Sequence, residues 1–348
     1  MTTLTQASIM SRKGIRYIIY TIIFLIVARL TYTTGISLYN QFFPPPPPPP
    51  TLAFGKLSKI QFPEKVKHNL SFTVETAEGG LPVTPAQVNV FFMPKISPNL
   101  LSLDFAKEKA TNLGFNPESQ QISESLYKFY HKQVPSTFEI DIITNTFSIS
   151  YDLNADPTPL SIRPPQQDLA TSQIRSYLSS ANFMPEDLSG PVIHQYLKTQ
   201  AAEFIPAVSL SDANLIRVDL FRRPYDEMPV VTKSPTQSNV WFMLSGFGDK
   251  SRSVVAGEYH YFPVDETQAS TYPIITSDAA WQELTSGNYY PASLGTTTEN
   301  ESIKIRKVYL AYYDSGLYTQ FLEPIYVFEG DKNFVGYVPA VVKDYYGE

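Results

Sequence analysis

The feature that most constrains this chain is a continuous apolar segment near its N-terminus. Residues 17–39 read YIIYTIIFLIVARLTYTTGISLY, and Arg29 is the one charged residue among them. At about 1.5 Å per residue, a helix of this length measures roughly 35 Å, which is enough to cross a bilayer. We therefore expect a transmembrane helix at residues 17–39, in contact with membrane lipid.

Basic residues flank this segment on its N-terminal side. Arg12, Lys13 and Arg16 precede it, and residues 1–16 contain no acidic residue. Lys and Arg beside a spanning helix are retained in the cytoplasm. The pattern predicts a cytoplasmic tail at residues 1–16 and a single-pass protein of the plasma membrane, with an extracytoplasmic body.

A cleaved signal peptide is the competing interpretation of the same segment. Its apolar run would be residues 18–28, yet no clear small-x-small cleavage site follows this run. Tyr17 and Tyr39 place aromatic rings at both ends of the longer segment, as retained helices do. Retention of the helix is therefore favoured over cleavage.

Arg29 needs its own explanation, because a charge near the bilayer centre costs at least ~2.5 kcal/mol. Its side chain either extends to the outer membrane interface or pairs with an acidic residue in a partner's transmembrane helix. The first alternative is favoured, and the second makes Arg29 the candidate contact with a membrane partner.

Seven consecutive prolines follow at residues 44–50. Consecutive prolines form a stiff polyproline II rod, here about 22 Å long at ~3.1 Å per residue. We expect residues 40–51 to be a proline-rich spacer that holds the body away from the membrane.

The charge of the body disfavours nucleic acid as a partner. Four of the 27 basic residues and none of the 33 acidic residues lie in residues 1–50, which leaves 23 basic against 33 acidic residues after them. Phosphate binding needs clustered Lys and Arg, so an acidic body is poorly suited to it.

The chain contains no cysteine. This excludes disulfides, thiolate metal sites and thiol nucleophiles. An exported protein without cysteine fits a bacterial cell envelope better than an animal secretory pathway.

Residue patterns after the spacer predict an α+β fold with antiparallel sheets and short helices on one face. Helices are predicted at residues 103–113, 168–180, 192–204 and 278–285, the last capped by Ser277. Strands are predicted at residues 52–62, 70–75, 87–93, 137–143, 146–153, 239–246, 253–263, 303–313, 317–328 and 334–342. Short turns join residues 137–153 and 239–263 into hairpins, and the last three strands into an antiparallel meander.

Proline clusters and linker-like segments divide this body into two or three domains. Four prolines lie between residues 157 and 165, and residues 232–238 read as a linker. We expect a first extracytoplasmic α+β domain at residues 52–160, a middle α+β region at 161–235 and a C-terminal domain at 236–348.

A short internal echo suggests a duplication. Residues 113–118 read LGFNPE and residues 181–186 read ANFMPE, and each stretch follows a predicted helix. Phe, then Pro and Glu, would pack a ring under the helix end and begin the next element. Duplication of a helix-plus-sheet unit is a hypothesis at this point.

The C-terminal third carries a family resemblance. The residues concerned are AWQELTSG (280–287), VYLAYY (308–313), FLEPIYVFEG (321–330) and YVPAV (337–341). Residues 272–342 resemble the C-terminal domain of YycH/YycI-type membrane-anchored regulatory proteins and are similar to small PepSY-type repeats. That family attends a sensor histidine kinase, so the resemblance implies a regulatory or scaffolding role. It transfers no catalytic residue, and residues 52–270 show no comparable motif.

Motifs for chemistry are weak throughout the chain. The four histidines are far apart in sequence, and Ser125-Leu-Tyr-Lys128 lacks the K-T-G motif that accompanies S-x-x-K in penicillin-interacting enzymes. Neither a G-x-S-x-G motif nor a P-loop is present. We therefore predict no catalytic residue, no cofactor and no metal site.

Two pairs of adjacent tyrosines are the candidate binding surface. Tyr312 with Tyr313 ends the strand predicted at residues 303–313, and Tyr289 with Tyr290 is also interpreted as strand. Neighbouring residues of a strand face opposite sides, so we expect one member of each pair to be exposed.

These observations favour a non-enzymatic, membrane-anchored extracytoplasmic protein of regulatory or scaffolding function. Its expected partner is a protein of the envelope or membrane, with a sensor histidine kinase as one candidate. The alternative is a cell-envelope glycan-binding protein or hydrolase, in which carboxylates and tyrosines would line a cleft.

Overall fold

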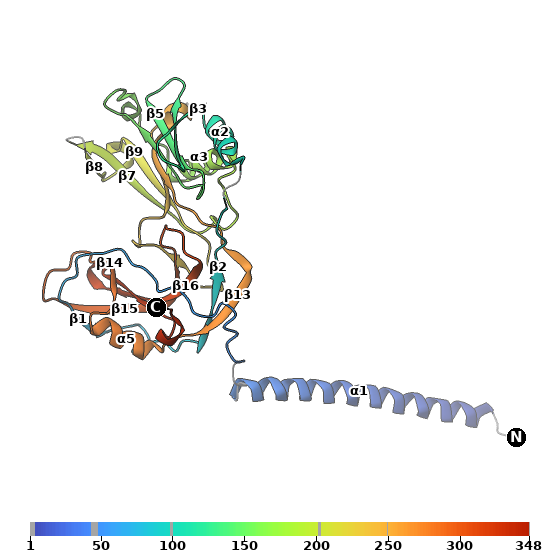
Figure 1. The fold of residues 1–348 in the computed structure, drawn as a ribbon. Coiled ribbons are helices and arrows are strands. Elements are labelled where there is room, and N and C mark those ends of the chain that lie inside the picture. The colour runs from blue at the N-terminus through green and yellow to red at the C-terminus, as the bar shows by residue number, and fades with distance from the viewer. Residues whose placement is uncertain (1–3, 43–47, 98–99, 201–202, 249, 348) are drawn as a thin grey trace. The chain divides into compact units, whose positions relative to one another are not determined.

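The computed structural model describes residues 4–42, 48–97, 100–200, 203–248 and 250–347 (Figure 1). The chain forms two units, Met1–Pro49 and Pro50–Glu348. The first unit is one helix, α1 (Leu4–Phe42), and its residues Tyr17–Tyr39 are long and apolar enough to cross a membrane. The expected proline rod falls largely on residues outside those described.

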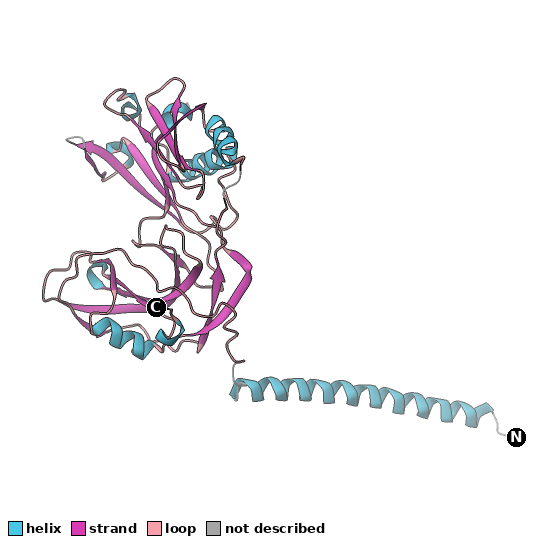
Figure 2. Cartoon of the chain, in the orientation of Figure 1, coloured by secondary structure: helices cyan, strands magenta, loops and turns pink. Residues whose placement is uncertain are grey.

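The second unit is built mainly of strands, with a few short helices (Figure 2). Its strands form one sheet of nine and one of eight. The predicted α+β class with short helices on one face is therefore confirmed. The segment from Phe115 to Tyr259 supplies the nine-stranded sheet, whereas the eight-stranded sheet takes strands from both sides of this segment and the short β10 (Val230–Val231) from within it. The boundary expected near residue 160 lies between two strands of the nine-stranded sheet, β6 (Phe147–Tyr151) and β7 (Val192–Gln200), whereas the segment near residue 235 links β10 of the eight-stranded sheet to β11 (Val240–Leu244) of the nine-stranded sheet.

The nine-stranded sheet is antiparallel throughout and runs in the order β3-β4-β5-β6-β12-β11-β9-β7-β8. Its strands are β3 (Phe115–Gln121), β4 (Leu126–His131), β5 (Ser136–Asp141), β6 (Phe147–Tyr151), β7 (Val192–Gln200), β8 (Glu203–Pro206), β9 (Leu215–Leu220), β11 (Val240–Leu244) and β12 (Val254–Tyr259). The helices α2 (Ser102–Asn112) and α3 (Gln167–Ser180) share one apolar core with it, because their buried residues, such as Ala106 and Ile174, pack against the sheet's Phe138 and Phe242.

This sheet contains the same arrangement twice. α2 precedes the meander β3-β4-β5-β6, and α3 precedes β7-β9-β11-β12, with β8 added at the outer edge. The two meanders join where β6 pairs with β12. Phe115 and Phe183, the aromatic residues of the sequence echo, are both buried in the shared core. The topology therefore supports the duplication hypothesis.

The eight-stranded sheet has the central order β1-β15-β16-β17-β14, with β2 beside β16, β13 beside β2, and β10 beside β15. Its strands are β1 (Ser71–Val74), β2 (Gln87–Phe92), β10 (Val230–Val231), β13 (Asp265–Pro273), β14 (Tyr290–Ser293), β15 (Ser302–Tyr313), β16 (Phe321–Gly330) and β17 (Val335–Pro339). The predicted meander of β15, β16 and β17 is confirmed. β1 and β10 run parallel to β15, so the sheet is mixed.

Helix α5 (Ser277–Thr285) covers one face of this sheet, with Ala280 and Leu284 buried in the core. Its N-cap is Thr276, whose Oγ1 accepts a hydrogen bond from the Ala279 amide at 3.2 Å. The expected cap, Ser277, is instead the first helical residue. The remaining helical turns are α4 (Lys250–Ser253), η1 (Thr158–Ser161), η2 (Leu210–Asp212), η3 (Asp331–Asn333) and η4 (Lys343–Tyr345).

Two other expectations are wrong. The helix expected at residues 192–204 is instead the strand β7 and the start of β8, because the β-branched and aromatic residues of β7 pair with β9 from Val192 to Leu197, and the end of β7 pairs with β8. The strand expected at residues 52–62 is an irregular segment with one bridge, between Leu57 and Tyr346. Strands β3, β4, β9, β10, β13 and β14 were not among the predicted strand ranges.

Candidate functional site

The four tyrosines expected to form a binding surface are buried. Tyr289 and Tyr312 belong to the core under α5, and Tyr290 and Tyr313 belong to a second core on the opposite face of the same sheet. Each pair does face opposite sides, as expected. Neither side is open surface, however, because both faces of the sheet are covered.

The cover of the second face is an extended segment, residues 58–67, which we call the strap. In Figure 1 it belongs to the blue trace that crosses toward β14. Ile60 and Phe62 pack against the core, and the Phe62 ring stacks on Tyr290 at 4.8 Å between centroids and 5° between planes. The same ring lies 4.8 Å from that of Tyr313. The strap therefore completes an aromatic core that the sheet alone would leave exposed.

The strap is held at its two ends and by side chains. At one end the Leu57 amide donates to the Tyr345 carbonyl at 2.8 Å, and at the other the Asn69 amide donates to Glu299 at 2.9 Å. Between them, Lys65 Nζ donates to the Ala292 carbonyl at 2.8 Å. Within the described chain, the backbone of residues 58–67 forms no hydrogen bond. Its amides and carbonyls are thus free to pair with another chain.

Three hollows lie along the strap, and together with it they form what we call the strap groove. The Glu323 hollow measures ≈ 340 Å³, and the Trp241 and Tyr290 hollows measure ≈ 530 Å³ each. The Glu323 and Trp241 hollows share Gln61, Tyr313 and further lining residues. The Trp241 and Tyr290 hollows share Phe62 and Pro63. The hollows therefore adjoin one another along the strap.

Glu323 is the most unusual group in this groove. It lies on β16 directly opposite Tyr313 of β15, and its side chain is nearly inaccessible, since the residue is 5% exposed. Burial raises the pKa of Glu323 to about 8, and the Tyr346 hydroxyl offsets part of this rise without completing a hydrogen bond to Oε2. Glu323 Oε2 and the Tyr313 hydroxyl are both buried without a hydrogen-bond partner in the described chain.

Side chains of the nine-stranded sheet form the far wall of the Trp241 hollow. The Arg217 guanidinium lies 4.1 Å from the centroid of the Trp241 ring and binds Asp219 through two hydrogen bonds of 2.7 and 2.9 Å. His260 Nε2 lies 3.6 Å from Glu258. Burial lowers the pKa of His260, and Glu258 offsets part of that effect. This wall offers one aromatic face and one carboxylate to a ligand.

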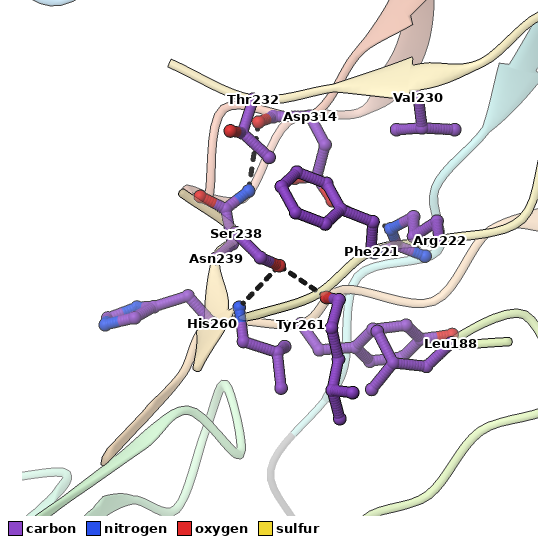
Figure 3. Close-up of a pocket in the computed structure, with 12 residues that line it drawn as sticks. Leu188, Phe221, Arg222, Val230, Thr232, Ser238, Asn239, His260, Tyr261 and Asp314 are labelled. Atoms are coloured by element: carbon purple, nitrogen blue, oxygen red, sulfur yellow. Dashed lines mark hydrogen bonds and ion pairs between the residues drawn. The ribbon is translucent and has the colours of Figure 1, made fainter. Parts of the chain in front are cut away.

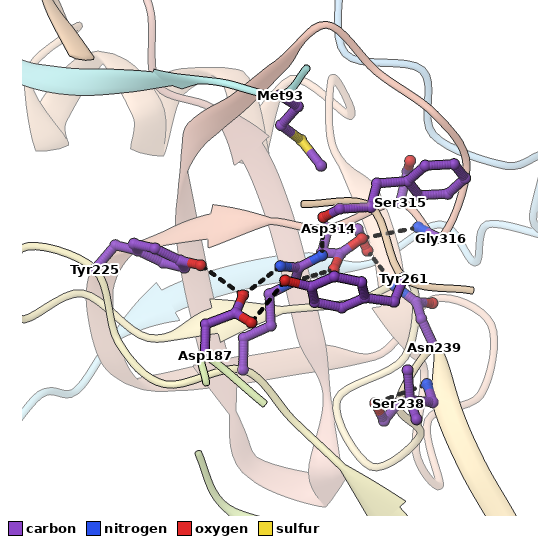
Figure 4. A network of polar contacts seen from close by, with 12 residues as sticks. Met93, Asp187, Tyr225, Ser238, Asn239, Tyr261, Asp314, Ser315 and Gly316 are labelled. Carbon is purple, nitrogen blue, oxygen red and sulfur yellow. Dashed lines mark hydrogen bonds and ion pairs between the residues drawn. The ribbon is translucent and has the colours of Figure 1, made fainter. Parts of the chain in front are cut away.

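A buried ion cluster joins the two sheets behind this groove (Figure 4). Arg222, which follows β9, pairs with Asp187 at 2.5 Å and with Asp314, at the end of β15, at 2.7 Å. The Tyr225 and Tyr261 hydroxyls each donate to Asp187 at 2.7 Å. Burial alone would lower the pKa of Arg222, but the two aspartates raise it above its ordinary value. The charged and hydroxyl groups of this cluster are paired with one another. We therefore interpret the cluster as a structural joint, which fastens one sheet to the other.

The cavity beside this cluster is too small to hold a ligand (Figure 3). Its volume is ≈ 10 Å³, about that of one water-sized probe. Asn239 Nδ2 donates to the Asp314 carbonyl at 3.0 Å, and Ser238 Oγ donates to the Leu220 carbonyl and accepts from the Val240 amide. The Asn239 bond holds the start of β11 against the end of β15, and the Ser238 bonds hold it against the end of β9.

The remaining sequence candidate, Arg29, belongs to the first unit of the chain. Arg29 is on α1, with an exposed side chain. Among the residues that the structure describes, no group of three or more His, Asp or Glu is arranged to hold a metal ion. Of the four histidines considered for chemistry, His260 lines the Trp241 hollow.

Sequence patterns missed most of this groove. Glu323 carries a signal, because it is the one charged residue in the apolar run FLEPIYVF (residues 321–328). The strap has no such signal in the sequence, because its pattern of apolar residues is that of an ordinary strand. The joint has no sequence signal either, since Asp187, Arg222 and Asp314 are far apart in the chain.

No family model matches the chain, and no curated protein matches it. Among solved structures, the chain is similar to the crystal structure of an uncharacterized protein from Eubacterium rectale, at 12% sequence identity and a TM-score of 0.39. The match covers 80% of this chain and 85% of that chain. Similarity at this level supports no statement about function, so the geometry of the strap groove carries the functional argument.

Proposed function

We propose that this chain is a membrane-anchored extracytoplasmic protein that binds an extended segment of a partner protein in the strap groove. Its role is regulatory or scaffolding and does not involve catalysis. The observation that carries the proposal is the strap itself, an extended segment with unpaired backbone on an aromatic sheet face, flanked by three adjoining hollows.

Extended peptides bind proteins through main-chain hydrogen bonds and through pockets for alternate side chains. The free amides and carbonyls of the strap supply the first requirement. The hollows, at ≈ 340 to ≈ 530 Å³, supply the second, and Leu317 and Tyr318 add exposed apolar surface at the rim. A partner segment beside the strap would therefore gain both kinds of contact.

The place of the strap in the sequence supports a regulatory role. Residues 58–67 follow the proline run at residues 44–50 closely, and that run follows the apolar helix α1. A partner that shifts the strap would therefore act on a segment close in sequence to α1. The resemblance of residues 272–342 to YycH/YycI-type proteins adds a membrane sensor histidine kinase as the candidate partner.

Site-specific photocrosslinking in intact membranes tests this proposal. A photoreactive residue at position 317, where the native Leu317 is 69% exposed and lines two of the hollows, should capture a partner protein. The matched control is position 208, where Val208 is 95% exposed and lies between β8 and β9. Capture of one protein at 317 and not at 208 supports the proposal. Equal yields, or no capture at 317, would refute it.

The alternative is a glycan-binding protein or hydrolase that uses the Trp241 hollow. Glycosidases commonly need two carboxyl groups some 5–10 Å apart. Among the residues lining this hollow, Glu258 is the one carboxylate, which favours binding over hydrolysis. Retention of the protein on peptidoglycan, lost in Trp241→Ala and combined with no crosslink at position 317, would favour this alternative.

A further inference from the structure

The Glu323 hollow has the features of a built site. The strap residues Ser58 to Gln61 form one side, the loop of residues 315–320 forms another, and Tyr313, Phe321 and Glu323 also line it. Its ≈ 340 Å³ lies within the usual range of ligand pockets. The hollow therefore has the size, the enclosure and the polar groups that a specific ligand requires.

Two polar atoms of the residues that line this hollow lack partners in the described chain. Glu323 Oε2 and the Tyr313 hydroxyl are buried, come from residues paired across β15 and β16, and form no hydrogen bond in the described chain. A buried carboxyl without a partner is costly, and the great majority of buried polar groups in proteins are paired. A ligand that donates hydrogen bonds would satisfy both atoms.

The charge and the rings around Glu323 select a cation. The rings of Tyr313, Tyr318 and Phe321 line the hollow, and aromatic faces attract ammonium and guanidinium groups. An anion would meet the Glu323 carboxyl. Lys59, the one basic residue of the lining, is exposed and forms no ion pair with Glu323. Its charge lowers the affinity for a cation without filling the hollow.

We propose that the Glu323 hollow binds the ammonium or guanidinium end of an alkyl chain. Two sources have this chemistry, a Lys or Arg side chain of a partner protein and a free aliphatic amine. The first source rests on the proposed function, because the hollow is one end of the strap groove. The second would make the hollow an independent ligand site.

Binding should be coupled to release of a proton. Burial raises the pKa of Glu323 to about 8, so its carboxyl is mainly neutral at pH 7, whereas a bound cation favours the ionised form. The other ionisable groups near it are Lys59, Tyr272, Tyr313, Tyr318 and Tyr346, and burial raises the pKa of Tyr272, Tyr313 and Tyr346 above the ordinary value. Glu323 is therefore the group that titrates between pH 6 and 9.

Calorimetry with the full chain in lipid nanodiscs tests the site. The probes are acetyl-Ala-Lys-Ala-amide, its norleucine analogue, which lacks the ammonium group, and cadaverine as the free amine. We expect the lysine peptide to bind about tenfold more tightly at pH 9 than at pH 7, because the ionised fraction of Glu323 rises by that factor. The norleucine peptide should bind at least tenfold more weakly than the lysine peptide at pH 9.

Substitutions distinguish the effect of the Glu323 carboxyl on binding from the effects of the residues around it. Glu323→Gln should weaken lysine-peptide binding at least tenfold at pH 9 and remove the pH dependence. Glu118→Gln, which changes an exposed carboxylate on β3 outside the strap groove, should leave both unchanged. Since Glu323 is buried, exposed Gln61 at the rim gives a second test, in which Gln61→Glu strengthens and Gln61→Lys weakens binding, each roughly threefold.

The outcomes distinguish this site from the proposed function. Equal binding of lysine and norleucine peptides, full affinity in Glu323→Gln, or equal affinities of the two Gln61 variants would each overturn the cation site. A crosslinked partner at position 317 without peptide binding means that only the cation site fails. Cadaverine binding as tight as that of the peptide, with no crosslinked partner, means that the site stands and the proposed function fails.

Discussion

The two sheets of this protein close their cores in different ways. In the nine-stranded sheet, α2 and α3 each cover the meander that follows them directly in the chain. In the eight-stranded sheet, α5 covers one face locally, but the other face depends on the strap, where Lys65 bonds a carbonyl 227 positions away. A core closed by local helices is self-contained. A core closed by a distant segment with unpaired backbone offers a place where a partner can act.

The joint between the sheets should give the largest effect of any substitution considered. Arg222→Met leaves Asp187 and Asp314 buried without their counter-charge, which costs about 3–5 kcal/mol. The two tryptophans allow each sheet to be followed separately, since Trp241 lies on β11 and Trp281 on α5. In a Trp241→Phe background the remaining Trp281 reports the unfolding of the eight-stranded sheet, which we call the Trp281 transition. In a Trp281→Phe background Trp241 reports the unfolding of the nine-stranded sheet, the Trp241 transition. Denaturant unfolding of Arg222→Met in each background measures the loss in each transition.

Arg223→Met is the matched control for the joint. Its guanidinium pairs with Glu266 at an exposed position, so the loss should stay below about 1 kcal/mol. A loss of similar size in the two variants would contradict the view that the buried cluster fastens one sheet to the other.

Loss of the strap's aromatic anchor should give the next largest effect. Phe62→Ala removes the stack on Tyr290 and the contact with Tyr313, and should cost about 2 kcal/mol. The loss should appear in the Trp281 transition and be much smaller in the Trp241 transition, because the strap completes the core of the eight-stranded sheet. Val66→Ala, at a strap residue that is 76% exposed, should change stability by less than about 0.5 kcal/mol. Equal shifts of both transitions would show that the two cores are not independent.

Sequence reasoning succeeded where structure is local. The hairpin at residues 137–153, the meander at residues 303–342 and the helices α2, α3 and α5 follow from periodicity and turn residues. It failed at β7, whose strand state is set by pairing with β9. It also failed for Tyr290 and Tyr313, because their burial depends on a cover supplied by Phe62, more than two hundred residues earlier. A residue's own pattern does not reveal what covers it.

The buried carboxyl should make the eight-stranded sheet sensitive to pH. The pKa of Glu323 is raised from 4.5 to about 8 on folding, so the folded state holds its proton more tightly than the unfolded chain. Its contribution to stability is complete below pH 4.5 and is lost as pH rises to about 8, at roughly 1 kcal/mol per pH unit. Glu323→Gln should remove this slope from the Trp281 transition, and Glu64→Gln should keep it. An unchanged slope in Glu323→Gln would assign the pH dependence to other groups.

The smallest expected effect on stability comes from substitutions at equivalent positions of the two repeats of the nine-stranded sheet. Each repeat ends its helix with a left-handed residue just after the C-cap, Gly114 with φ 99° and Asn182 with φ 57°. Asn182→Ala should cost about 1 kcal/mol, because alanine lacks the polar side chain that eases this conformation. Gly114→Ala should cost more, since its φ is further from the left-handed minimum and the new Cβ would lie 3.0 Å from His131 Nε2. Unfolding followed through Trp241 measures both, and a larger loss at Asn182 would show that the two turns, though alike in position, are held by different contacts.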